Sequence, residues 1–141
     1  DQLTLQQLDL TLFTYHKIVN MQIVPVTASK NGLPKYQLNL TFPLLAYSKQ
    51  AYLRKCVDKI IESKLNYRTL YETDNASDLK ALALQGLGVA WLPRLLIEEE
   101  INENKLKILD GYSFFQDIYI VRSNIIYSQK INFVWNYLAL K

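Results

Sequence analysis

The sequence has few of the residues on which many metal sites and disulfide frameworks depend. Among 141 residues there is one cysteine (Cys56), one histidine (His16) and one methionine, with only four glycines and four prolines. A lone cysteine cannot form an internal disulfide, and one cysteine with one histidine cannot supply the usual ligand set of a zinc site. We therefore expect no metal site.

The motifs of common enzymes are missing as well. No G-x-S-x-G and no G-x-x-x-x-G-K-[ST] occurs. The G-L-G at residues 86–88 follows a predicted helix, whereas dinucleotide binding needs such glycines before one. The acidic residues 98–100 are adjacent, so they point in different directions around a helix and do not form a catalytic carboxylate pair. We expect a protein that is not an enzyme and binds no cofactor.

Two further absences restrict localisation and partners. No apolar run approaches the roughly 20 residues of a membrane-spanning helix, and the first residues lack the basic-then-apolar pattern of a secretion signal. The net charge is only +3, and the basic residues form no Lys/Arg-rich block. We expect a cytoplasmic protein without a membrane partner, and we do not expect this chain alone to bind DNA specifically.

The residues that are present predict an α/β fold. Half of them are apolar and about a fifth are charged, as in globular domains. Short β-branched and aromatic runs alternate with amphipathic stretches. We expect strands at residues 9–15, 21–29, 42–47, 68–73, 89–92, 105–109 and 115–122, and helices at residues 3–8, 50–63, 75–86, 94–101 and 130–140.

The stretch from residue 67 to 94 carries the clearest pattern. A strand leads to a polar corner, where Asn75 and Asp78 resemble a capping box. Gly86 can adopt the left-handed conformation that ends the following helix. The apolar run at residues 89–92 is typical of a buried parallel strand, so the unit implies a right-handed crossover and a sheet with helices on its faces. Pro25, by contrast, suggests that the strand at residues 21–29 is an edge or is bent.

The run S-D-L-K-A-L-A-L-Q-G-L-G-V-A-W-L-P, residues 77–93, resembles the signature of the effector-binding domain of LysR-type bacterial transcriptional regulators. Residues 42–53, F-P-L-L-A-Y-S-K-Q-A-Y-L, further resemble the branch that includes hypochlorite-responsive regulators. The resemblance extends over the whole chain. It implies a two-lobe fold of the periplasmic-binding-protein type (type 2) that binds a small effector between the lobes.

The resemblance also implies how the chain divides. Residues 1–141 would form one effector-binding domain, with the first lobe at residues 1–28 and 113–141 and the second at residues 29–112. In the family, a DNA-binding winged helix and the first strand–helix unit of the effector domain lie upstream of this region. Neither is in this sequence, so we expect the first lobe to be incomplete and DNA contact to require the upstream domain.

Two strand-to-helix corners form the candidate effector site. Helix N-termini present free backbone N–H groups that attract anions and small polar molecules, and the resemblance places both corners at the inter-lobe cleft. Asp74 is a departure, because its charge opposes a nearby anion. Serine and asparagine at such corners are also common helix caps, and His16 is also typical of a surface loop, so both interpretations stay open. The candidate residues are Tyr47, Ser48, Lys49, Gln50, Thr73, Asp74, Asn75, Ser77, Trp91, Tyr15 and His16.

The predicted C-terminal helix is apolar on two sides. Phe133 and Tyr137 lie on one stripe and Trp135 lies on the other. Such a helix packs deeply within its own domain or meets another subunit. Family members pair their effector domains, so the resemblance implies a homo-oligomer that uses Phe133, Trp135 and Tyr137.

Three functions remain open at this point. The first is the effector-sensing domain of a LysR-type regulator, the second a solute-binding lobe that serves a transporter, and the third a dimerisation module without a ligand. Cys56 falls on the apolar stripe of the helix at residues 50–63, which favours a buried small hydrophobe over a reactive thiol. With Met21 it makes up a very small set of oxidisable sulfur atoms, which weakens an oxidant-sensing interpretation.

Overall fold

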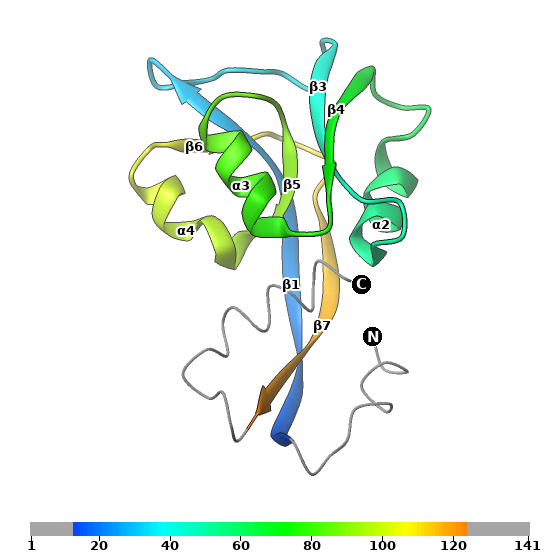
Figure 1. Ribbon diagram of the computed structural model, residues 1–141. Coiled ribbons are helices and arrows are strands. Elements are labelled where there is room, and N and C mark those ends of the chain that lie inside the picture. The colour runs from blue at the N-terminus through cyan, green and yellow to red at the C-terminus, as the bar shows by residue number, and fades with distance from the viewer. Residues whose placement is uncertain (1–12, 124–141) are drawn as a thin grey trace.

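The computed structural model describes the backbone of residues 13–123 and the side chains of residues 20–117. From β3 to β6 strands and helices alternate, as in an α/β fold (Figure 1). The elements in chain order are β1 (Phe13–Lys30), β2 (Leu33–Pro34), β3 (Phe42–Tyr47), α2 (Tyr52–Ile61), β4 (Tyr67–Thr73), α3 (Ala76–Leu84), β5 (Ala90–Pro93), α4 (Arg94–Asn102), β6 (Leu106–Ile108) and β7 (Phe114–Ser123).

The long strand β1 is the centre of the larger sheet, and its four partners all run antiparallel to it. Ile23 pairs with β5 on one side and with β7 on the other. Val26 likewise lies between β5 and β6. β7 and β6 therefore follow one another along one edge of β1, while β5 occupies the other edge. Figure 1 shows β1 and β7 continuing together beyond the helices.

The prediction of two separate strands at residues 9–15 and 21–29 is wrong for the described part, because Phe13 to Lys30 form one strand of 18 residues. The prediction that Pro25 marks an edge strand is wrong as well, since Pro25 is buried and pairs with Trp91 of β5, whereas a bend at Pro25 stays a prediction. The carbonyl of Pro25 accepts a hydrogen bond from Leu109 N at 2.9 Å. Pro25 therefore lies between the part of β1 that pairs with β6 and the part that pairs with β7. At this position the absent N–H of proline removes no hydrogen bond from the sheet.

Strands β3 and β4 form a second, parallel pair that is connected to β5 through backbone contacts of Val89. Val89 N donates to the carbonyl of Pro43, and Leu45 N donates to the carbonyl of Val89, each at 2.9 Å. A Cβ on Gly88 would lie 2.6 Å from the Pro43 oxygen. The close approach of the two backbones therefore requires glycine at position 88.

One core fills the space between the sheets and the helices. Trp91 of β5 is 1% exposed and lies next to the ring of Phe42, with 6.4 Å between ring centroids. The helix α2 buries Leu53, Val57 and Ile61 against this core. The predicted helix at residues 50–63 is confirmed, with bounds two residues shorter at each end.

The capping box predicted at the start of α3 is only half right. Asn75 is the N-cap, and its Oδ1 accepts from Ser77 N at 2.7 Å. The Asp78 carboxylate accepts instead from the hydroxyl of Thr73, and Asn75 N donates to that same hydroxyl oxygen. The Thr73 hydroxyl therefore lies between the two groups that a capping box would join directly, Asn75 N and the Asp78 carboxylate. It does so because the end of β4 brings its side chain next to the helix.

Several predictions fall outside the described residues. These include the helices at residues 3–8 and 130–140 and the first part of the strand at residues 9–15. The proposed division into lobes at residues 28/29 and 112/113 stays a prediction.

We predict that Gly88→Ala destabilises the protein by about 3 kcal/mol, because the new methyl group meets a backbone oxygen that cannot move away. Gly32→Ala is the matched control: a Cβ added at this position would meet no atom within 4 Å, so only its φ of +79° costs stability, about 1 kcal/mol. Urea denaturation measures both. Equal losses in the two variants would contradict the close contact.

Candidate functional site

The structure brings the two predicted corners together at the carboxyl ends of β3 and β4. Tyr47 and Thr73 are opposite each other in the parallel register. Beyond them, Ser48 N donates to the carbonyl of Thr73 at 2.9 Å, and Gln50 Nε2 contacts Asp74 Oδ1 at 3.4 Å. The corners therefore form one continuous surface. β1 and β7 extend together past this end of the β3–β4 pair (Figure 1).

The N-terminus of α2 supplies uncapped backbone amides at this surface. Its N-cap is Ala51, which has no side-chain acceptor. Ala51 and Leu53 are each 1% exposed, so the first turn lies against the protein rather than in bulk water. Among the described residues the first-turn amides have no side-chain acceptor, and such amides, together with the helix dipole, favour an anion or a polar acceptor at this end.

Ser48 does not cap α2, so the capping interpretation is wrong for this residue. Its carbonyl accepts from Ala51 N at 2.9 Å and closes a turn before the helix. Its hydroxyl forms no hydrogen bond with another residue of the described part of the chain. The Ser48 hydroxyl is thus available as a donor beside the amides of α2.

The α3 corner is satisfied by its own side chains. Asn75 caps the helix, so the capping interpretation holds there, and Ser77 lies inside the first turn, where its N–H is the group that is capped. Asp78 adds a negative charge to the same turn. The attraction for an anion therefore comes mainly from α2.

Arg54 brings a cation close to the corners, but its charge is balanced. It contacts Asp58 at 2.9 Å and Glu72 at 3.4 Å, and its Nη1 donates to the carbonyl of Tyr47 at 2.9 Å. Burial by itself would lower the pKa of Arg54, but these two carboxylates raise it. Lys49, in contrast, forms no ion pair within residues 20–117, so its charge is not balanced there.

The two predicted aromatic residues support the corner from beneath. Tyr47 is 2% and Trp91 1% exposed, and the Tyr47 hydroxyl donates to the carbonyl of Trp91 at 2.9 Å. A space of only about 10 Å³ remains among Tyr47, Trp91 and Arg54. In this structure the rings do not form open walls of a cleft, because each packs into the core behind it.

The remaining predicted residues lie outside the described side chains. Tyr15 and His16 are placed by their backbones on β1, opposite Arg122 and Val121 of β7, so their part in the site stays a prediction. The predicted dimerisation residues Phe133, Trp135 and Tyr137 are outside the described residues altogether.

Cys56 is half-buried at the edge of the apolar stripe of α2. Its Sγ lies 3.6 Å from Gln116 Oε1, and burial raises the pKa of the thiol. A raised pKa keeps the thiol protonated and less nucleophilic. Within residues 13–123 there is also no cluster of three His, Cys, Asp or Glu side chains that could hold a metal ion, and no helix of sufficient length and apolarity to span a membrane.

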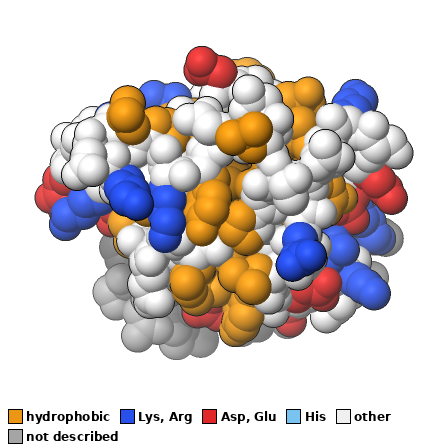
Figure 2. Space-filling view, turned by 90° about the horizontal axis from the view of Figure 1, so that it is seen from above, with side chains coloured by type: hydrophobic (Ala, Val, Ile, Leu, Met, Phe, Trp, Pro, Cys, Tyr) orange, Lys and Arg blue, Asp and Glu red, His pale blue; other side chains and the backbone are white. Residues whose placement is uncertain are grey.

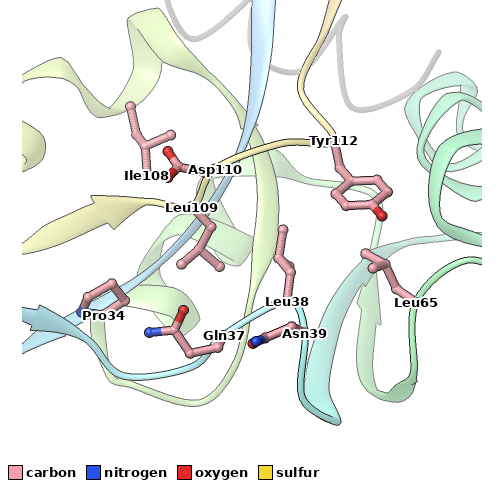
Figure 3. A pocket seen from close by; sticks show the side chains of 9 residues that line it. All are labelled: Pro34, Gln37, Leu38, Asn39, Leu65, Ile108, Leu109, Asp110 and Tyr112. Atoms are coloured by element: carbon pink, nitrogen blue, oxygen red, sulfur yellow. The ribbon is translucent and has the colours of Figure 1, made fainter.

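One hollow was not predicted from the sequence. A cavity of about 330 Å³ lies at the opposite end of β3 and β4, beside their amino ends (Figure 3). The residue pair Gly111 and Tyr112, both with positive φ, forms the turn beside it. The turn signal D-G-Y was visible in the sequence, but nothing there indicated which loops it would meet. The cavity is lined by Pro34, Gln37, Leu38, Asn39, Leu65, Ile108, Leu109, Asp110 and Tyr112.

Comparison with known proteins shows the family to which this chain belongs. Residues 3–128 match the family model described as the LysR substrate binding domain. The chain belongs to this family. The LysR-type resemblance and the predicted two-lobe, periplasmic-binding-protein-like α/β fold are thereby confirmed.

Two curated relatives are regulators from Escherichia coli. The chain is 33% identical over 102 residues to the HTH-type transcriptional regulator YjiE of strain K12, covering 70% of this chain and 34% of the relative. It is 32% identical over 102 residues to the HTH domain-truncated transcriptional regulator QseD of O157:H7, covering 70% of this chain and 42% of the relative. The chain thus spans less than half the length of either relative.

A regulator of Salmonella typhimurium is similar in structure. Full-length HypT, described as a hypochlorite-specific LysR-type transcriptional regulator, matches with a TM-score of 0.68 and 29% identity, over 88% of this chain and 45% of that one. The bromide-bound regulatory domain of HypT matches with a TM-score of 0.67 and 29% identity, over 93% and 67%. The predicted similarity to the branch with hypochlorite-responsive regulators is confirmed.

We predict that Tyr47→Phe lowers the free energy of unfolding by about 1–2 kcal/mol at neutral pH, because the buried Trp91 carbonyl loses its donor. Burial raises the pKa of Tyr47 far above its ordinary value near 10. The unfolded chain therefore ionises at Tyr47 first, and stability is lost as the pH rises above about 10. Denaturation at pH 8 and pH 11 should show a smaller alkaline loss in Tyr47→Phe than in the unmodified chain; an equal loss would contradict the burial of the phenol.

Proposed function

We propose that this chain is the ligand-sensing regulatory domain of a LysR-type transcription regulator in the cytoplasm. Its ligand is a small polar or anionic molecule held at the corners formed by residues 47–50 and 73–77. The observation that carries this proposal is the junction of the two corners, 2.9 Å between Ser48 N and the Thr73 carbonyl oxygen, beside the uncapped amides of α2. Ser48 and Lys49 offer a donor and a charge at the same place.

The bromide-bound form of the HypT regulatory domain supports an anionic ligand, since a related domain of the same fold is described with a small anion. The chemistry of the described corner agrees with it. Amide N–H groups, a hydroxyl and a lysine all act as donors to an acceptor ligand. Asp74 and Asp78 act against a strongly charged anion, which favours a small or singly charged one.

In the whole protein, DNA would be contacted by a winged-helix domain outside this sequence, and this domain would report the presence of the effector. The alternative of a solute-binding lobe for a transporter is less well supported, because the relatives of known role are transcriptional regulators. Those roles also support a protein without enzymatic activity.

We predict that Ser48→Ala weakens binding of a small anion about fivefold, the loss expected when one hydrogen-bond donor to the ligand is removed. Bromide titration at constant ionic strength, followed by NMR chemical shifts, measures the affinity, and Ser77→Ala tests the second corner in the same way.

Ser48→Ala should leave the free energy of unfolding unchanged, because Ser48 is not a cap. Asn75→Ala is the contrasting variant, with a loss of about 1 kcal/mol in stability. Unchanged bromide affinity in both serine variants would overturn the site.

We further propose that two copies pair through the C-terminal residues Phe133, Trp135 and Tyr137. A described surface that supports pairing is β4, whose central residues 68–72 are all exposed, including Leu70 at 55% and Tyr71 at 47%. β4 lies at the edge of the β3–β4 pair. An exposed edge strand with apolar side chains is a surface that a second chain can cover.

Light scattering at high micromolar concentration should therefore show a dimer. Trp135→Glu should shift it to a monomer without lowering the melting temperature, because the ring would be partly exposed in a single copy. Leu70→Glu tests β4 in the same measurement. If Trp135→Glu lowers the melting temperature instead, the C-terminal residues pack within their own domain, and a monomeric unmodified chain would rule out pairing.

A further inference from the structure

The cavity at the amino ends of β3 and β4 is separate from the proposed effector site. Its lining comes from the ends of β2 and β6, from the loops that precede β3 and β4 and from the segment between β6 and β7, and it shares no residue with the two corners. Each strand has six or seven residues, so about 20 Å of sheet lies between the two ends. A ligand at one end cannot touch the other.

The cavity has the make-up of a small-molecule site. Its volume of about 330 Å³ falls in the range of ligand pockets. Leu38 and Leu109 form a buried floor, at 8% and 5% exposed. Gln37 and Asn39 add amide groups, and neither side chain has a hydrogen-bond partner within the described part of the chain. An apolar floor with a few free polar groups is the usual composition of such pockets.

Asp110 is the one charged residue among the described residues of the lining. Among the described residues it forms no ion pair, whereas the four ion pairs found there all involve other carboxylates. The ring of Tyr112 stands at one end of the cavity, next to Leu65 (Figure 3). A carboxylate and an aromatic face both attract an organic cation.

The position of the Tyr112 ring is fixed by its backbone. Gly111 and Tyr112 have φ of 83° and 59°, and a tyrosine in this region carries strain. The Tyr112 carbonyl accepts a hydrogen bond from Trp91 Nε1 at 2.7 Å, and Trp91 belongs to the buried core. The core therefore holds the turn in a conformation that places the ring at the cavity. Strain held in place by its surroundings is frequent at binding sites.

Figure 2 shows the end of the molecule at which β3 and β4 begin. Hydrophobic side chains gather across the middle of this face, and basic side chains lie to both sides. The basic side chains oppose a cation at long range. Salt limits their reach to about 8 Å under physiological conditions, while Asp110 is part of the lining itself. We expect weak binding that depends on the immediate contacts.

We propose that this cavity is a second ligand site, which takes a small organic ammonium compound with an apolar or aromatic body. The apolar body lies on Leu38 and Leu109, the ammonium group faces Asp110, and the ring of Tyr112 covers one end. This inference does not depend on the proposed effector site, because the two share no residue and prefer opposite charges.

The test uses the 141-residue chain and benzylammonium as the probe, with benzyl alcohol and benzoate as neutral and anionic compounds of the same ring. NMR titrations report both the affinity and the residues affected. Benzylammonium should bind most tightly of the three and shift the amides of residues 37–39, 65 and 108–112. Asp110→Asn should weaken benzylammonium about fivefold, as for a partly exposed ion pair.

Two further variants complete the design. Tyr112→Asn removes the ring but keeps the backbone carbonyl for Trp91, and asparagine tolerates positive φ, so the fold should be retained while benzylammonium binding weakens severalfold. Glu98→Gln removes an exposed carboxylate from α4 and should change nothing. The proposal is overturned if benzylammonium does not bind, if benzoate binds here equally well, or if the affinity is the same in Asp110→Asn and Tyr112→Asn as in the unmodified chain.

Discussion

The backbone contact between residues 43–45 and 88–89 is the constraint on which the rest of the structure depends. Two hydrogen bonds of 2.9 Å join β3 to Val89, and the missing side chain of Gly88 lets the strands approach. This contact connects the parallel pair β3–β4 to the sheet around β1. Through it, the β3–β4 pair, the helix α2 and both corners are held in place against the core, whereas α3 also packs directly on β5 and β1.

Much of the fold could be predicted because its signals are local. The apolar spacing of α2, the glycine that follows α3 and the short apolar run of β5 each depend on neighbouring residues. The error at Pro25 has a different cause. A proline is excluded from a central strand only where its missing N–H would be needed, and here the partner strand changes at that point. Such a change depends on residues more than 80 positions away, which no local pattern reveals.

The candidate site was predictable to a smaller extent. The sequence located both corners, but it could not show which one leaves its amides free. Asn75 caps its helix and Ser48 does not, although both precede a helix in the sequence. The difference is where each helix begins: α2 starts at Tyr52, four residues after Ser48, and α3 starts directly after Asn75. Boundaries of this kind depend on tertiary packing, here the burial of Ala51 and Leu53.

The direction of the parallel strands accounts for the different ligand chemistry that we propose at the two ends of the sheet. Each strand of the pair is followed by a helix, so helix N-termini and their partial positive charge gather at the carboxyl ends. The amino ends receive loops instead, and any attraction for a ligand there must come from side chains. Among the described residues that line this cavity, the one charged side chain is a carboxylate, Asp110. The proposed preference for an anion at one end therefore follows from the topology, whereas the proposed preference for a cation at the other depends on two side chains, Asp110 and Tyr112.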